Sequence, residues 1–455
     1  MKILALAGTY PHPGHLFSGV FNEKCVVALS ELCNYVEVLA PRPYVPPGFT
    51  FLPRWKSYGA IKGYEIRNGV AVYRPATPVI PRVGAALWVD LAPFVLCRGL
   101  ARRLHRRTKF DAIISFDLVQ AGGLAWRIGK DLGIPAAGWA FGNDIRHPKL
   151  SPLGGVVARA IERLDVVFYQ SRELFEKGAS LLGLSPDRMP CDRHVILPHG
   201  IPPPPPLPRR QVRDRIRQEW GIPEGHAVVL YTGRIFREKG VFELLEAVSL
   251  AASRDSRITC VVVGSHPAYD ETGAVRKKLD ENPLLKERIR LLPVCTPDRV
   301  WEYLCAADIF AFPSHKEGMS NSLLEAMIMG VPAVAFAIPS VLEIGAETEA
   351  LLMVPPFDSE LFSEAILRLA ASPDERVRIG EIAKGQVMGR FMVRKNMAKA
   401  LDHLVQVIEE RKIAMSLKKQ TPLNEKHRIS ATRASNTLDC PCPKPQFENQ
   451  SCSFL

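Results

Sequence analysis

Short apolar runs alternate with helical patterns along the first half of the chain. Runs typical of buried strands lie at 2–8, 35–41, 111–117 and 134–140. Patterns with apolar residues at helical spacing follow them, at 23–32, 124–133 and 165–183. This alternation indicates a parallel sheet whose strands are joined by crossover helices.

The second half repeats the same style. Apolar runs at 226–234, 258–265, 289–294, 309–314, 331–336 and 350–355 alternate with helical patterns at 242–252, 300–308 and 322–330. The predicted fold class is therefore α/β, with two doubly wound, Rossmann-like domains that face each other across a cleft.

A proline run separates the two halves. The sequence VILPHGIPPPPPLPRRQ disfavours both helix and sheet, which predicts a stiff interdomain linker; the alternative is a ligand for a proline-binding module. Past residue 411 the apolar periodicity is lost. The predicted units are a first domain at 1–194, the linker at 195–211, a second domain at 212–390, a final helix at 391–411 and a disordered basic tail at 412–455.

Composition excludes several classes of protein. The chain has 455 residues, of which 47% are hydrophobic and 23% charged, a profile typical of a globular protein of two domains. No run reaches the roughly 18 to 20 apolar residues that a membrane span needs, and no cleavage site follows the first apolar stretch. We therefore expect an unexported, cytoplasmic protein. The ten cysteines are scattered and support neither a zinc site nor a disulfide framework.

The net charge of +12 is concentrated in one segment. Residues 51–109 hold twelve Lys and Arg but only two acidic residues, which leaves +10 there. Within it, residues 84–109 run from an apolar stretch into RGLARRLHRRTK. One interpretation is peripheral contact with an anionic membrane surface, at the inner face of the cytoplasmic membrane. The other is a core-packed helix with a solvated arginine face. No nucleic-acid-binding module accompanies the charge, so a nucleic-acid partner is not expected.

Two loops at predicted strand ends carry chemistry suited to a nucleotide diphosphate. In TGRIFREKG, Arg234 and Lys239 follow a strand that ends at Gly233, and both cations can reach one pyrophosphate. In KEGMSNSLLEAM, small residues precede a helix whose first N–H groups can bind an anion. A weaker signal is the strand end at Val294, where backbone groups can meet a base.

The second loop holds two glutamates, Glu317 before the helix and Glu325 within it. Carboxylates accept hydrogen bonds from hydroxyls, so the pair can hold the two ends of an elongated nucleotide sugar. A structural interpretation carries equal weight, because Ser322 and Glu325 also fit the S-x-x-E capping box.

These motifs, with AADIFAFPSHKEGMSNSLLEAMIMGVPAVAF, resemble the donor-binding half of glycosyltransferase family 4, the retaining enzymes of GT-B architecture. The resemblance covers Met1 to about residue 410. The first half is similar to family members that build cell-surface polysaccharides. It implies that Arg234 and Lys239 hold the donor diphosphate, while Glu317 contacts the donor sugar and Glu325 the ribose. The resemblance further assigns the phosphates to the backbone of Gly318, Met319, Ser320, Asn321 and Ser322, and the base to the segment near Val294.

In the first half, Gly19 matches the position where the family's glycine-containing loop comes close to the ligand. Family members often have a histidine before the glycine in the loop that reads WAFGNDIRHP here, and this chain has Phe141. A phenyl ring can exchange no proton and donate no hydrogen bond, so that role does not carry over. Asp144 matches the family's aspartate, and Asn143 is available for a sugar hydroxyl.

The resulting expectation is a metal-independent, retaining glycosyltransferase without a cofactor. It would move a sugar from a nucleotide diphosphate sugar to a glycan or lipid-linked acceptor, with Arg234, Lys239 and Glu317 as catalytic residues. No D-x-D pair suggests a metal site. Two alternatives remain: a nucleotide-sugar-binding protein that has lost transfer, suggested by Phe141, and a nucleotide-sugar epimerase of the same architecture.

Overall fold

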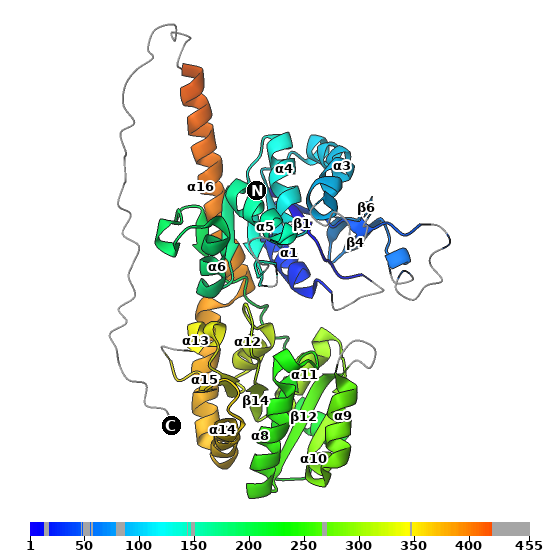
Figure 1. Ribbon diagram of the computed structural model, residues 1–455, viewed down its shortest axis with the longest axis vertical. Coiled ribbons are helices and arrows are strands. Elements are labelled where there is room, and N and C mark those ends of the chain that lie inside the picture. Colours follow the sequence, from blue (N-terminus) through cyan, green and yellow to red (C-terminus); the bar gives the residue numbers. More distant parts are fainter. Residues whose placement is uncertain are drawn as a thin grey trace.

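Two α/β domains stand one above the other in the computed structural model, which describes residues 1–12, 18–46, 48, 55, 58–78, 87–142, 144–146, 151–265, 271–345 and 348–420 (Figure 1). Each domain is built around its own sheet, which is parallel throughout in the second domain and parallel but for one strand in the first. The two-domain α/β prediction is confirmed.

The first domain has an eight-stranded sheet in the order β10-β9-β8-β7-β1-β2-β5-β4. Every adjacent pair is parallel except β4 and β5, which are antiparallel. The strands are β1 (Lys2–Ala7), β2 (Tyr35–Leu39), β4 (Tyr64–Arg67), β5 (Val70–Tyr73), β7 (Ala112–Phe116), β8 (Ala136–Ala140), β9 (Val166–Tyr169) and β10 (His194–Ile196). A separate two-stranded sheet pairs β3 (Arg42–Pro43) with β6 (Ala76–Thr77).

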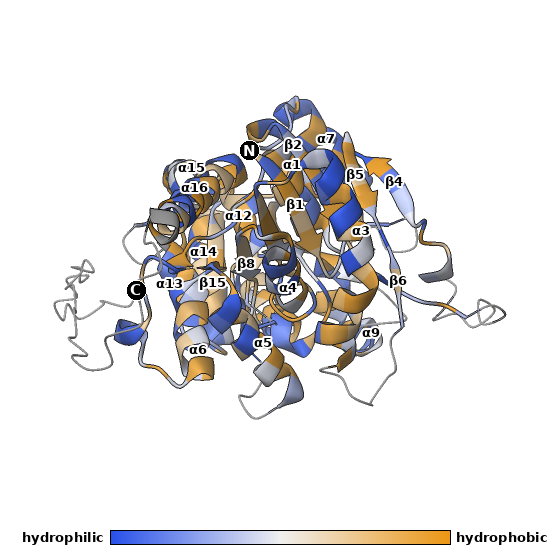
Figure 2. Cartoon of the chain, turned by 90° about the horizontal axis from the view of Figure 1, so that it is seen from above, coloured by the Kyte–Doolittle hydropathy of each residue, from blue (hydrophilic) through white to orange (hydrophobic). Residues whose placement is uncertain are grey.

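Helices cover both faces of this sheet. Alternate residues of β1 enter different cores. Ile3 packs with α1 (Val20–Leu32) and α16 (Val393–Gln420), and Leu4 packs with the helices on the other face, α3 to α6. The helices are α1 (Val20–Leu32), η1 (Leu87–Leu91), α3 (Ala92–Thr108), α4 (Gly122–Leu132), α5 (Pro152–Arg163), α6 (Arg172–Leu182) and the short η2 (Pro186–Arg188). Figure 2 shows hydrophobic strands such as β1 in the interior and hydrophilic residues on the outer helices.

The second domain has a six-stranded parallel sheet in the order β13-β12-β11-β14-β15-β16, with one continuous core. Its strands are β11 (Ala227–Thr232), β12 (Ile258–Ser265), β13 (Ile289–Pro293), β14 (Ile309–Phe312), β15 (Ala333–Phe336) and β16 (Leu352–Val354). Its helices are α7 (Arg209–Glu219), η3 (Arg237–Lys239), α8 (Val241–Arg254), α9 (Thr272–Glu281), α10 (Pro283–Arg288), α11 (Pro297–Ala306), α12 (Asn321–Ile328), α13 (Pro339–Gly345), α14 (Ser359–Ala371) and α15 (Pro373–Arg390).

The chain crosses between the domains twice, and the two crossings lie side by side. The N–H of Ile201 donates to the carbonyl of Phe391 over 2.8 Å, and the N–H of Val393 returns a bond to Ile201 over 2.9 Å. Gly200 has a positive φ of 81°, and a Cβ there would lie 2.5 Å from the Phe391 oxygen. Only glycine suits that position. The final helix, α16 (Val393–Gln420), then packs Met397 and Leu404 against the first sheet.

Three element bounds differ from those predicted. The strand β10 continues to Ile196, past the predicted domain end at 194, because it pairs with β9. The helix α7 begins at Arg209, inside the predicted linker, since the proline run ends at Pro208 and Val212 turns into the core. The helix α16 runs to Gln420 rather than 411, in a stretch without proline or glycine. The remaining predicted tail, 421–455, lies outside the described residues.

Candidate active site

A cavity of about 480 Å³ lies where the two domains face each other. The helix α1 contributes Phe21 and Lys24 from the first domain, opposite α12 of the second (Figure 1). Most of the predicted donor-side residues line this one space: Gly233, Arg234, Lys239, Val294, Glu317, Met319, Ser320, Asn321, Ser322 and Glu325. The structure thus brings together residues that lie up to 92 positions apart in the sequence.

The loop after β11 is held by backbone contacts rather than by its charged side chains. The hydroxyl of Tyr231 donates to the carbonyl of Arg234 over 2.9 Å, and the N–H of His315 donates to Glu238 over 3.0 Å. Gly240 has a φ of 70° and touches Pro313 so closely that a Cβ would lie 1.7 Å from its carbonyl oxygen. The loops after β11 and β14 are therefore fixed to each other, and their side chains are free to face the cavity.

The two cations of this loop differ in their partners. Arg234 is exposed, and among the described residues its guanidinium forms no ion pair, although it lies 5.3 Å from the ring centre of Phe236. Lys239 contacts the carboxylate of Glu317. A free guanidinium beside a neutralised lysine leaves the pocket ready for an anion.

The helix α12 begins at the cavity wall. Ser320 is its N-cap, and the serine oxygen accepts from the N–H of Leu323 over 3.3 Å. Glu325 instead forms an ion pair across the domain gap, with its Oε1 2.8 Å from Nζ of Lys24. The alternative prediction that Ser322 and Glu325 form a capping box is therefore wrong, because the cap lies two residues earlier and the glutamate points away from it.

A second cavity of about 680 Å³ adjoins the first. Both are lined by Arg234, Lys239, Glu317 and Met319, so the two cavities meet at these residues. The second cavity adds Gly318 from the second domain and, from the first, Thr9, Asp117, Gln120, Phe141 and Asp144. The candidate active site is thus one space shared by both domains.

Two carboxylates of this second cavity, the buried Asp144 and the half-buried Asp117, accept hydrogen bonds from the backbone. Asp144 accepts from the N–H groups of Phe141, Gly142 and Leu118 at 2.8 to 3.2 Å, and burial raises its pKa. Asp117 accepts from the N–H groups of Gly8, Gln120 and Ala121 at 2.6 to 2.9 Å. Burial, and then the charge of Asp144, raise the pKa of Asp117 to about 6. Asp144, predicted on the sugar side, holds its loop in shape.

Phe141 occupies the position where the family often has histidine, and it packs among other rings. Its ring lies 5.3 Å from that of His199, edge to face, and 6.4 Å from that of Phe116, stacked. Burial, and then the charge of Lys24, lower the pKa of His199 to about 3, so this imidazole is neutral. The neighbouring Asn143, predicted to meet a sugar, lies outside the described residues.

Gly19, predicted to lie close to the ligand, is not among the described residues that line these two cavities. It is the N-cap of α1 with a φ of 75°, and a Cβ there would lie 2.5 Å from the carbonyl oxygen of Thr9. Position 19 requires glycine because the start of α1 packs directly against the backbone that follows β1. Lys24 and Asp117, by contrast, line the site without having been predicted, because neither has a sequence motif.

Gly318 of the second domain lies close to the backbone of the first domain. A Cβ there would lie 2.7 Å from the carbonyl oxygen of Phe141 and 3.2 Å from Cα of Gly142. Gly318→Ala should therefore hold the domains apart and lower the sugar transfer expected from the sequence by about 10- to 100-fold, because catalysis depends on orientation at the ångström scale. Steady-state assays should show this loss without a lower temperature of unfolding. Gly273→Ala, with nothing within 4 Å of its Cβ, is the control; equal activity in both variants would contradict the argument.

Comparison with known proteins is consistent with this geometry. The family model for glycosyl transferases group 1 matches residues 212–386, which include the loops after β11 and β14. The chain is 28% identical over 413 residues to a putative teichuronic acid biosynthesis glycosyltransferase, TuaC, of Bacillus subtilis (strain 168). That alignment covers 90% of this chain and 99% of the relative.

Solved structures match over both domains. The sucrose-phosphate synthase of Thermosynechococcus elongatus superposes with a TM-score of 0.68 at 17% identity, covering 90% of this chain and all of that one. HepE of Anabaena in complex with UDP superposes with a TM-score of 0.65 at 17% identity, over 89% of this chain and all of its own. These matches show the GT-B fold.

Proposed function

We propose that the chain is a glycosyltransferase that transfers a sugar from a nucleotide diphosphate sugar with retention of configuration. The match of residues 212–386 to the group 1 family model and the GT-B fold support this proposal. The acceptor is a glycan or a lipid-linked saccharide of cell-surface polysaccharide synthesis. The similarity to TuaC over most of the chain supports that process, and the UDP complex of HepE supports a nucleotide donor.

One observation carries the proposal: the first cavity presents a free guanidinium, a helix start and two separated carboxylates to the same space. Arg234 and the N-terminus of α12 suit a diphosphate. Glu317 belongs to both cavities and suits the transferred sugar, whereas Glu325 lines only the first and suits the ribose. A nucleotide sugar that extends from Glu325 to Glu317 would place its anomeric carbon where the two cavities meet.

The chemistry of transfer then follows from charge. As the bond between the sugar and the diphosphate breaks, negative charge grows on the diphosphate, where Arg234, Lys239 and the first N–H groups of α12 stabilise it. The carboxylates of Asp117 and Asp144 accept hydrogen bonds from backbone N–H groups, which does not favour them as nucleophiles. The acceptor hydroxyl attacks from the face that the diphosphate leaves, and a diphosphate oxygen takes its proton.

The cations of the protein take the part that a metal ion plays in other transferases. Among the described residues, no group of three or more His, Cys, Asp and Glu side chains could hold a metal ion. In the proposed mechanism Arg234 and Lys239 supply the positive charge beside the diphosphate, so transfer should proceed unchanged in a chelator.

The test is a panel of UDP-, GDP-, ADP- and dTDP-sugars, incubated with the protein, a chelator and a membrane extract as the source of acceptor. We expect one donor to be consumed, and proton NMR of the purified product should show the same anomeric configuration as in the donor. An inverted product would contradict the retaining mechanism, and a requirement for added metal would contradict metal independence. Consumption without acceptor, with conversion to an isomeric sugar, would favour an epimerase.

The basic helix α3 suits peripheral contact with an anionic membrane. One of its faces packs into the core, while the face that continues from η1 exposes the large apolar side chains of Leu87, Leu91, Val95 and Leu96. Arg103 and Arg106 follow on the outer face and form no ion pair among the described residues, whereas Arg98 and Arg102 pair with Asp131. The expected solvated arginine face is therefore partly neutralised by Asp131. Its unpaired arginines, Arg103 and Arg106, follow the exposed apolar side chains of η1 and the start of α3. No described helix is both long and apolar enough to cross a membrane.

Reversing the two free charges should weaken membrane binding. Each basic residue near an anionic surface contributes on the order of 1 kcal/mol, so Arg103→Glu with Arg106→Glu should lower partitioning into phosphatidylglycerol vesicles by at least about 30-fold. Co-sedimentation at low salt measures this, with phosphatidylcholine vesicles for comparison. Lys277→Glu with Lys286→Glu makes the same charge change on the exposed surface of the second domain and is the control. Equal partitioning of the two double variants would rule out this face.

A further inference from the structure

A third cavity, of about 350 Å³, lies in the first domain beside the candidate active site. It starts at the carboxyl end of β1, where the exposed side chains of Thr9 and Gln120 also line the second cavity. A molecule held in the third cavity can therefore present a group to the junction at which the sugar would be transferred.

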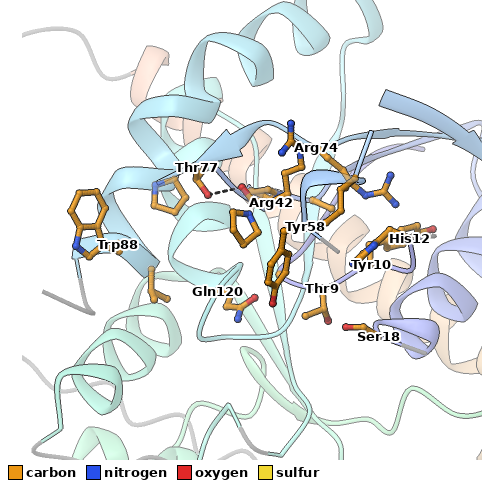
Figure 3. A pocket seen from close by; sticks show the side chains of 17 residues that line it. Thr9, Tyr10, His12, Ser18, Arg42, Tyr58, Arg74, Thr77, Trp88 and Gln120 are labelled. Carbon is orange, nitrogen blue, oxygen red and sulfur yellow. Dashed lines mark hydrogen bonds between the residues drawn. The ribbon is translucent and has the colours of Figure 1, made fainter. Parts of the chain in front are cut away.

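Three aromatic side chains, Tyr10, Tyr58 and Trp88, line the third cavity. Figure 3 shows Trp88 at one end, Tyr10 at the other and the ring of Tyr58 between them. Aromatic side chains with a polar tip combine a large apolar surface with a hydrogen-bonding group. The C–H faces and hydroxyls of a saccharide match that combination.

The charged side chains of the wall are both basic. Arg42 and Arg74 line the cavity together with the imidazole of His12, and no described Asp or Glu does so. Arg74 is already satisfied, because its guanidinium lies 2.7 Å from the carboxylate of Glu65 and donates to the carbonyl of Pro11 over 2.7 Å. Its charge is neutralised inside the domain.

Arg42 differs from Arg74, since its guanidinium has no hydrogen-bond or ion-pair partner among the described residues. Its Nε is buried and unsatisfied. The backbone of Arg42 is held by two hydrogen bonds: its N–H donates to the carbonyl of Pro75 over 3.0 Å, and its carbonyl accepts from the hydroxyl of Thr77 over 3.2 Å. Figure 3 shows the second of these bonds as a dashed line. A buried donor without a partner is costly unless a ligand completes it.

We propose that the third cavity is the acceptor subsite and that it selects an acceptor saccharide carrying an anionic group, which pairs with Arg42 while Tyr58 and Trp88 pack against the sugar ring. This inference rests on the proposed function and names the class of its acceptor. A guanidinium binds a carboxylate or a phosphate through paired hydrogen bonds, so both anions share the required chemistry. A uronic acid supplies the first and a sugar phosphate the second.

The position of Trp88 also places this subsite beside the proposed membrane face. Trp88 and Val89 line the cavity from η1, the same short helix that exposes Leu87 and Leu91. A phosphate that links a saccharide to a membrane lipid would enter from this end.

The experiment measures binding of three small probes to the full chain by titration calorimetry: methyl β-glucoside, methyl β-glucuronide and glucose 1-phosphate. A saturating nucleoside diphosphate, chosen by its stabilisation of the protein, keeps the probes out of the donor cavity. The variants are Arg42→Gln, Arg42→Lys and, as the control, Arg163→Gln, which removes an exposed charge elsewhere in the same domain.

We expect at least one anionic probe to bind the wild type about tenfold or more tightly than the neutral glucoside. Arg42→Gln should abolish that preference, Arg42→Lys should keep part of it, and Arg163→Gln should keep all of it. A preference for glucuronide alone identifies a carboxylate acceptor, and a preference for glucose 1-phosphate alone a phosphate.

Equal binding of charged and neutral probes to the wild type, or an unchanged preference in Arg42→Gln, would overturn the inference. If the wild type binds no nucleotide donor and transfers no sugar, that result would instead count against the proposed function. The two failures are distinguishable, because the probe preference is measured without any transfer reaction.

Discussion

Replacing Arg234 by Gln is expected to lower the rate of sugar transfer by about 10²- to 10³-fold, the usual cost of removing one preorganised donor from a developing negative charge. The reason is the position of the side chain: it lines both cavities of the candidate active site, is exposed, and has no ion-pair partner among the described residues. Its loop is held by Tyr231 and Gly240, so the fold does not depend on the guanidinium.

Arg237→Gln is the matched control for this prediction. Arg237 lies in the same loop and is also exposed, but its guanidinium stacks 4.7 Å from the ring centre of Phe242 and does not line the cavities. Steady-state kinetics and thermal unfolding of both variants separate the two effects. If Arg237→Gln loses as much activity as Arg234→Gln, the loss reflects the general charge of the loop and not a contact with the diphosphate.

Glu317→Gln should lower turnover by about 10- to 100-fold, as expected for loss of a charge-assisted hydrogen bond to the transferred sugar. The carboxylate contacts Lys239, and the carbonyl of Glu317 accepts from Arg146 of the first domain over 2.9 Å. The glutamine keeps that backbone contact and the shape of the side chain. Stability should change little, because half-exposed ion pairs contribute about 1 kcal/mol or less.

Turnover and the free energy of unfolding should be measured on the same preparations. Glu281→Gln, which removes an exposed carboxylate at the end of α9, is the control. Turnover of Glu317→Gln within twofold of the wild type would show that this carboxylate does not contact the sugar. A parallel fall in stability and turnover would assign it to the fold instead.

Local patterns of the sequence predicted the fold well, since strands and helices leave their periodicity in neighbouring residues. The run at 226–234 followed by 242–252 became β11 and α8, and the small residues before Leu323 became the start of α12. The bounds failed where distant contacts decide them. The strand β10 extends because β9 lies beside it, and Ser320 caps α12 in place of Ser322.

The candidate site was predicted only as far as motifs mark it. Arg234, Lys239 and Glu317 carry a recognisable spacing, and they converge on one cavity. Lys24 has no such signal, because its partner Glu325 lies 301 residues away and the pair forms only when the domains meet. Gly19 was predicted from the sequence to lie close to a ligand. In the structure, the carbonyl of Thr9 lies so close to Gly19 that it leaves no room for a side chain.

The central claim, that the cavity facing α12 binds a nucleotide diphosphate sugar, is tested most directly by thermal unfolding with UDP, GDP, ADP and their common sugar conjugates. Wild type should be compared with Glu325→Gln and with Lys24→Met, which breaks the same ion pair but keeps the carboxylate. We expect one nucleotide, at about 100 times its dissociation constant, to stabilise the wild type by about 2.7 kcal/mol. Lys24→Met should keep this response and Glu325→Gln should lose most of it. No response to any nucleotide, or equal responses in all three proteins, would contradict the account.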